Sequence, residues 1–248
     1  MLCQRADVSA RVERVLLGLN WTVAQVQPEH ASRQGVGLCF SPMDVPRVLE
    51  WPGTLSERPT TELVQWLNSW EPCQAAVGAS VVNALINASS GALSQSVPLD
   101  NGFPAHLQVF GHFAPQLAGA SVAVIGRYPG LENCFGPEVK LTCIERRPQP
   151  GDLPDPAAEF ILPAADWVFI TASSIANKTL PRLLELSRDA RVVLMGPSLP
   201  WLMDWADFGV NYLAGVTTTD PDALFTIAAE GGGTRIFGRG VQYRLLAL

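Results

Sequence analysis

The segment DWVFITASSIANKTLPRLLELS, residues 166–187, decides the fold. It begins with a short apolar run, continues through a loop of small polar residues, and ends in a stretch with leucines at helical spacing. This order is typical of a strand, a turn and a helix in an α/β sheet. We therefore expect a helix over 175–187, with Leu180, Leu183, Leu184 and Leu186 mostly on one face.

Short apolar runs of the same kind recur through the second half of the chain. They show little alternation, which is typical of parallel strands that are covered on both faces. A further helix is expected over 221–229. The C-terminal part therefore predicts an open, mainly parallel, Rossmann-like α/β sheet. Its five expected strands are SVAVIG (121–126), KLTCIE (140–145), DWVFIT (166–171), RVVLMG (191–196) and NYLAGV (211–216).

The first hundred residues predict a smaller α+β unit. The spacing of Val8, Val12, Val15 and Leu16 favours a short amphipathic helix over 7–18. The other expected elements are a hairpin of strands 21–26 and 35–40 joined by 27–34, a helix over 60–66 capped by Thr60 or Thr61, and a longer helix over 71–88.

Residues 96–120 mark the expected boundary between these parts. The segment is rich in proline and glycine and has no clear periodicity, as is typical of a domain crossing. We predict an N-terminal domain over 1–104 and a Rossmann-like domain over 105–248.

Charge and cysteine usage limit the possible partners. The net charge of −6 gives no general attraction to nucleic acid or anionic lipid, and no stretch has the apolar length of a membrane span. Five cysteines without a C-x-x-C pair favour free thiols in a reducing compartment, so we expect a cytoplasmic protein. Only 16% of the residues are charged in so apolar a chain, which favours a homodimer that hides part of the surface.

The loop after the third predicted strand is the strongest candidate site. Ligands bind beyond the carboxyl ends of parallel strands, where hydroxyls, backbone N–H groups and a helix N-terminus can receive an anion. Lys178, one of only two lysines in the chain, would add a positive charge. The alternative is that Ser174 only caps the helix and Lys178 is solvated. The candidate ligand contacts in this loop are Thr171, Ser173, Ser174, Asn177 and Lys178.

Two other strand ends contribute candidates. The first strand ends in GRYPG, with Gly126 and Arg127, which lacks the G-x-G-x-x-G needed for the usual binding of NAD or FAD. Glu145, nineteen positions after Gly126, could hold a hydroxylated ligand or a metal, or could pair with Arg146 or Arg147. The loop Gly196-Pro197-Ser198 suits close backbone approach to a ligand, or an ordinary turn.

Candidate metal ligands are Glu145, Asp166, Cys39 and His112. Asp166 also suits a turn or cap, Cys39 a small core residue, and His112 a surface group. No H-x-x-x-H or C-x-x-C pair and no G-x-S-x-G elbow is present in the sequence. On the helix expected over 71–88, Asn83 and Asn87 share a face, where they could form a structural clamp or contact a ligand.

Several motifs together resemble a prokaryotic family known as "Putative heavy-metal chelation". The resemblance covers about 105–245 and includes VIGRYPGLE (124–132), VVLMGPSLPW (192–201) and GVNYLAG (209–215), as well as the segment from Leu141 to Leu180; in the first half, GVGLCFSP (35–42) and SVVNALIN (80–87) are similar to the companion N-terminal domain.

The resemblance implies an enolase-N-terminal-like domain beside a Rossmann-like domain, with a site in the cleft between them. The cleft would be lined by Glu145, Asp166, Thr171, Asn177, Lys178 and the 196–198 loop. Arg127 stands where members of the family usually have a histidine, which weakens any metal site built on that position.

The leading hypothesis is a protein that binds a small anionic or metal-chelating ligand between its domains, with a divalent or heavy metal ion as the cofactor to consider. The alternative is an enzyme that holds a nucleotide-like cofactor and uses Glu145 or Lys178 for proton transfer. A third hypothesis is an assembly subunit whose cleft has no ligand.

Overall fold

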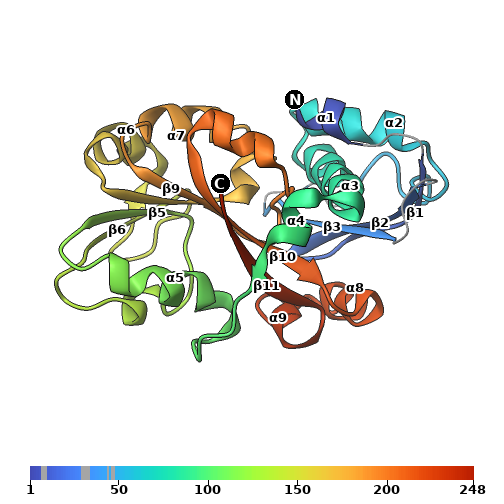
Figure 1. The fold of residues 1–248 in the computed structure, drawn as a ribbon. Coiled ribbons are helices and arrows are strands. Elements are labelled where there is room, and N and C mark those ends of the chain that lie inside the picture. The colour runs from blue at the N-terminus through green and yellow to red at the C-terminus, as the bar shows by residue number, and fades with distance from the viewer. Residues whose placement is uncertain (7–9, 29–33, 44, 46–47) are drawn as a thin grey trace.

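The structure is a computed structural model that describes residues 1–6, 10–28, 34–43, 45 and 48–248 (Figure 1). It contains a three-stranded antiparallel sheet, ordered β1-β2-β3, and an eight-stranded sheet, ordered β4-β11-β10-β9-β8-β5-β6-β7. The strands are β1 (Ala10–Leu17), β2 (Trp21–Pro28), β3 (Gly35–Phe40), β4 (Val97–Pro98), β5 (Ser121–Ile125), β6 (Lys140–Glu145), β7 (Leu153–Pro154), β8 (Trp167–Thr171), β9 (Arg191–Met195), β10 (Val210–Thr218) and β11 (Val241–Ala247). The α-helices are α1 (Leu2–Arg5), α2 (Thr60–Leu63), α3 (Pro72–Ser89), α4 (Gly91–Gln95), α5 (Gln108–Phe113), α6 (Ala158–Ile161), α7 (Leu180–Leu186), α8 (Pro221–Ala229) and α9 (Ile236–Arg239).

The five predicted strands of the second half are confirmed, and they run parallel to one another as β6, β5, β8, β9 and β10. Only the edge beyond β10 is antiparallel, where β11 and then β4 are added. In Figure 1, α6 and α7 lie on one face of this sheet and α5 on the other. The mixed α/β prediction with a mainly parallel sheet is therefore confirmed.

Side chains of β8 show why its sequence lacks alternation. Val168 and Ile170 pack with α6 and α7, whereas Trp167 and Phe169 pack with α5 on the opposite face. All four are buried because both faces of the sheet are covered. An apolar residue is therefore favoured at each successive position.

The small sheet lies between two helices from opposite ends of the chain. Ala24 and Val26 of β2 pack toward α3, and Trp21 and Val23 share a core with α8. α3 crosses β3 so closely that a Cβ atom at Gly37 would lie 2.1 Å from the Ser80 carbonyl oxygen. The hairpin of β2 and β3 is confirmed, while residues 29–33 of its connection lie outside the described residues.

The predicted helix over 7–18 is wrong: residues 10–17 form β1, and 7–9 lie outside the described residues. Val12 pairs with Val26 and Arg14 with Gln25, so the strand has a bulge between Val12 and Arg14. A bulge adds one residue to a strand. It therefore lets Val12 and Val15, three positions apart, pack against the same core, which imitates helical spacing.

The helices predicted over 71–88 and 221–229 are confirmed as α3 and α8. Glu71 caps α3 by accepting hydrogen bonds from the backbone N–H groups of Cys73 and Gln74. The helix expected over 60–66 is α2 followed by a 3-10 turn. Its predicted threonine cap is wrong, because Pro59 precedes the helix and the Thr60 hydroxyl donates to the Ala10 carbonyl.

The segment before the predicted domain boundary belongs to the larger sheet, because β4 at 97–98 pairs with β11. The division into 1–104 and 105–248 itself stays a prediction. None of the helices in the described part of the chain has the length and apolar character that crossing a bilayer requires.

Candidate functional site

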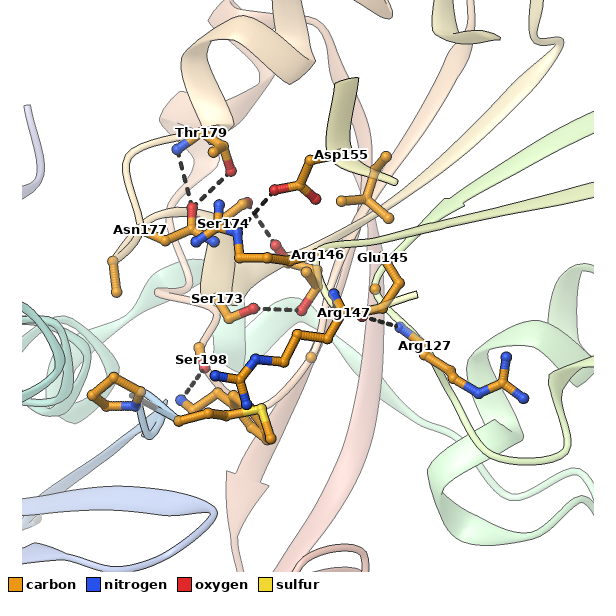
Figure 2. Close-up of a pocket in the computed structure, with 18 of the residues that line it drawn as sticks. Arg127, Glu145, Arg146, Arg147, Asp155, Ser173, Ser174, Asn177, Thr179 and Ser198 are labelled. Atoms are coloured by element: carbon orange, nitrogen blue, oxygen red, sulfur yellow. Dashed lines mark hydrogen bonds and ion pairs between the residues drawn. The ribbon is translucent and has the colours of Figure 1, made fainter. Parts of the chain in front are cut away.

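A cavity of about 1100 Å³ lies where the carboxyl ends of the parallel strands meet the three-stranded sheet and α3. The residues predicted to contact a ligand all line it. Figure 2 shows Arg127, Glu145, Ser173, Ser174, Asn177 and Ser198 among them. Their parts in binding stay predictions. They are Gly126, Arg127, Glu145, Thr171, Ser173, Ser174, Asn177, Lys178, Gly196, Pro197 and Ser198.

The loop after β8 is folded by its own hydroxyl groups. Ser174, which is buried, donates its hydroxyl to the Thr171 carbonyl oxygen at 2.6 Å, and the hydroxyls of Thr171 and Ser173 lie 3.0 Å apart. Asn177 Oδ1 accepts from both the backbone N–H and the hydroxyl of Thr179. These bonds place polar side chains along one wall of the cavity.

The predicted start of the helix in this loop is wrong. Residues 172–174 form a 3-10 turn, and α7 begins only at Leu180, with no side-chain cap. The reason is Lys178, whose φ of 67° lies in the left-handed region and interrupts any helix from 175 onward. The expected contribution of a helix N-terminus to anion binding therefore falls away, and the charge of Lys178 remains.

Lys178 has an unusual setting for a lysine. Its side chain is half-buried, and Nζ donates to the Ala176 carbonyl oxygen at 2.7 Å. Burial lowers the pKa of the ammonium group below its ordinary value, while the nearby Cys39 acts in the opposite direction. Within the described residues, no carboxylate forms an ion pair with Lys178. Its charge is thus open to an anion that enters the cavity.

Glu145 holds the backbone of two loops. Its Oε2 accepts from the Arg127 N–H at 2.9 Å and its Oε1 accepts from the Arg147 N–H at 3.1 Å. Arg146 pairs with Asp155 instead, so the expected ion pair between Glu145 and Arg146 is not formed. With each oxygen already accepting a backbone N–H group, Glu145 orients the loops after β5 and β6.

Arg127, in the loop after β5, is held in place by an ion pair. Its guanidinium pairs with Asp152, whose side chain is only 3% exposed, at 2.7 Å. Burial acts to raise the pKa of Asp152, but the backbone N–H of Gln149 and the charge of Arg127 outweigh it and lower that pKa. Cys143 beside them has a pKa raised to about 12 by burial and by Asp152.

The charges around the cavity are biased toward cations. Among the described lining residues, lysine and arginine contribute five side chains and aspartate and glutamate three, in a chain whose net charge is −6. In Figure 2, Arg147 extends from the end of β6 toward Ser198. The basic residues are Arg127, Arg146, Arg147, Lys178 and Arg182, and the acidic residues are Glu145, Asp155 and Glu159.

The loop 196–198 forms hydrogen bonds with the N-terminal half of the chain. Ser198 Oγ accepts from the Phe40 N–H at 3.0 Å, and Asn83 Nδ2 donates to the Pro197 carbonyl and to the Leu38 carbonyl. Asn87 donates to Asn83 Oδ1 and accepts from the Trp201 N–H. The structural-clamp interpretation of Asn83 and Asn87 is therefore confirmed.

The four candidate metal ligands do not come together. Asp166 lies at the opposite end of β8, where its carboxylate accepts from the Ser121 N–H, and His112 is exposed on α5 against Phe113. Cys39 is fully buried, and burial raises its pKa to about 12. No group of three or more His, Cys, Asp or Glu side chains in the described ranges could hold a metal ion. The donor set there does not fit a heavy metal, which prefers thiolate and imidazole ligands.

Sequence reasoning missed several other residues that line the cavity. Tyr128, in the GRYPG turn, interacts with Thr171, and burial raises its pKa to about 12. Phe40, Met43 and Trp70 line the cavity from the N-terminal half. They lie outside regular strand or helix patterns or at their ends, so periodicity does not select them.

The fold and cavity define a class: an α/β protein with a mostly parallel eight-stranded sheet, a small antiparallel sheet, and a pocket between the two. Family models described as "Putative heavy-metal chelation" match both parts, DUF364 over residues 108–247 and DUF4213 over 2–86. The chain belongs to the DUF364 family. The resemblance stated from the sequence is therefore confirmed.

Two solved structures are similar to this chain. A DUF364 protein of unknown function from Desulfitobacterium hafniense is 30% identical, with a TM-score of 0.86, and the match covers 100% of this chain and 96% of that one. Another from Pyrococcus horikoshii, at 19% identity, a TM-score of 0.80 and the same coverage, shares the fold. No curated protein matches this chain.

Proposed function

We propose that this protein binds a small anionic ligand in the cavity between its two sheets, with Lys178 as the main charge partner. The observation that carries the proposal is the Lys178 ammonium: half-buried, held in left-handed backbone, and without a carboxylate partner in the described residues. Strained backbone of this kind is concentrated at functional sites.

The surrounding polar groups support an anionic ligand. The hydroxyls of Thr171 and Ser173 lie beside each other on the cavity wall, and either can donate to an oxygen of the ligand. Gly196, with a φ of 112°, leaves space next to the Thr171 hydroxyl that a side chain would narrow. An anion at this position would meet a cation and hydroxyl donors together.

In this proposal, any metal ion is coordinated by the ligand and not by protein side chains. The described side chains offer no set of soft donors, so the ligand's own oxygen or nitrogen atoms would hold any metal that arrives with it. This agrees with the family description and with a site whose main feature is a positive charge. The bound species is then an anionic chelate rather than a bare cation.

The test is isothermal titration of the purified protein with inorganic phosphate, with citrate, and with citrate in the presence of Zn²⁺. We expect the wild-type protein to bind at least one of the anions, and Lys178→Met to weaken that binding by about tenfold or more, because a charge-assisted hydrogen bond contributes about 1.5–3 kcal/mol.

Lys140 is the matched control, since it is the only other lysine and lies exposed at the start of β6, away from the cavity. Lys140→Met should leave anion binding unchanged. Equal affinity of wild-type and Lys178→Met protein for every anion that binds would refute the proposal, as would tight binding of Zn²⁺ alone with no binding of anions.

A further inference from the structure

The apolar wall of the cavity is formed by side chains that a soluble protein ordinarily buries. Trp70 is 84% exposed, Met43 64% and Phe40 39%, and all three line the cavity. They come from the end of β3, the segment after it, and the residues just before α3. Large apolar side chains gathered at one concave surface are typical of a binding site.

The other half of the chain contributes a basic wall to the same cavity. Lys178 follows β8, and Arg127 and Arg147 follow β5 and β6. The two walls adjoin at Phe40, because its backbone N–H donates to Ser198 and the neighbouring Cys39 interacts electrostatically with Lys178. The cavity is thus apolar on one side and cationic on the other.

The cavity is too large for a simple ion to fill. A volume of about 1100 Å³ lies just above the usual range for sites that bind drug-sized ligands, roughly 300–1,000 Å³. A phosphate or sulfate ion would contact Lys178 and leave Trp70 and Met43 in water. A ligand that covers both walls needs a flat apolar body as well as an anionic group.

We infer that the natural ligand is an amphipathic organic anion, with a flat aromatic or otherwise apolar body against Trp70, Met43 and Phe40 and its anionic group at Lys178. This inference rests on the proposed function and adds the chemical class of the ligand. Aromatic contact with Trp70 supplies affinity, and the charge of Lys178 fixes the ligand's orientation.

The test compares three probes by isothermal titration: naphthalene-2-sulfonate, methanesulfonate, and neutral naphthalene-2-sulfonamide. We expect naphthalene-2-sulfonate to bind at least tenfold more tightly than either of the others. Lys178→Met should weaken the binding of naphthalene-2-sulfonate. Trp70→Ala should weaken it about two- to tenfold, the effect of one lost aromatic contact, and leave methanesulfonate binding unchanged.

Phe160→Ala is the matched control for Trp70→Ala. Phe160 is 82% exposed but does not line the cavity, so its removal should change no affinity. Because both aromatic side chains are largely in solvent, neither substitution removes a core contact.

Equal affinity for the two sulfonates, equal affinity for the neutral sulfonamide, or no effect of Trp70→Ala would overturn the inference. If phosphate or citrate still bound through Lys178 in that case, the proposed function would stand and only the amphipathic class would fail. If Lys178→Met weakened the binding of none of the anions, the proposed function itself would be refuted.

Discussion

Replacing Lys178 with glycine and with alanine should reverse the usual order of stability of these two residues. The φ of 67° at Lys178 places it in the left-handed region, where a residue with a Cβ atom is disfavoured by about 1–2 kcal/mol. Both variants lose the half-buried ammonium group and its hydrogen bond to the Ala176 carbonyl. Because both variants share these losses, the difference in stability between them reports the backbone conformation at position 178.

The expected difference follows from two opposing effects. Glycine escapes the left-handed penalty, but its greater freedom in the unfolded chain takes back about 0.5–1 kcal/mol. We therefore expect Lys178→Gly to be more stable than Lys178→Ala by about 0.5–1 kcal/mol. That difference corresponds to about 1–4 °C in Tm for a protein of this size.

Thr226 provides the control because it is exposed in the middle of α8. There the order should be the ordinary one, with Thr226→Ala more stable than Thr226→Gly by about 1 kcal/mol. Urea denaturation followed by circular dichroism measures all four variants. Equal stability at position 178, or a more stable alanine variant there, would refute the interpretation of Lys178 as a strained residue.

Three further predictions test other parts of the structure. Asn83→Asp should lower the free energy of unfolding by about 2–4 kcal/mol at pH 7, because a buried carboxylate cannot donate to the Leu38 and Pro197 carbonyls. This loss of stability should become smaller at lower pH, and an unchanged midpoint of urea denaturation would contradict the clamp. Cys39, with its pKa raised to about 12 and no exposed surface, should resist a thiol reagent at pH 8 in the native protein and react after unfolding in guanidinium, as peptide mapping by mass spectrometry would show. Asp152, whose pKa is lowered in the folded state, should stabilise the protein fully above its unfolded pKa of about 3.9, and this contribution should disappear as pH falls through the lower folded value. Arg127→Met should reduce that acid sensitivity in thermal melts between pH 2 and 5, and an unaltered pH profile would rule out the ion pair as its source.

The position of the cavity could be predicted without coordinates because it follows from the direction of the strands. Parallel strands bring their carboxyl ends to one edge, so Gly126, Glu145, Thr171 and Gly196 had to lie near one another once the five strands were identified. The same rule explains why Asp166 does not line the cavity. Asp166 precedes its strand and therefore lies at the other end of the sheet.

The N-terminal strand shows where pattern reasoning reaches its limit. One extra residue in β1 changes which side chains face the core, and a bulge gives no signal in a single sequence that distinguishes it from helical spacing. The apolar wall of the cavity was missed because exposure, too, depends on tertiary packing. A tryptophan is expected to be buried from its residue type alone, whereas Trp70 is exposed in the structure.

The sequence by itself determined the α/β class, the parallel strands and the edge of the sheet at which a site could form, because each depends on local apolar runs and on chain direction. Only the tertiary structure decided that Lys178 is held in left-handed backbone without a carboxylate partner in the described part of the chain, and that Trp70 and Phe40 line the same cavity. Those properties depend on contacts between segments more than a hundred residues apart, such as Phe40 with Ser198, and such contacts leave no periodic trace along the chain.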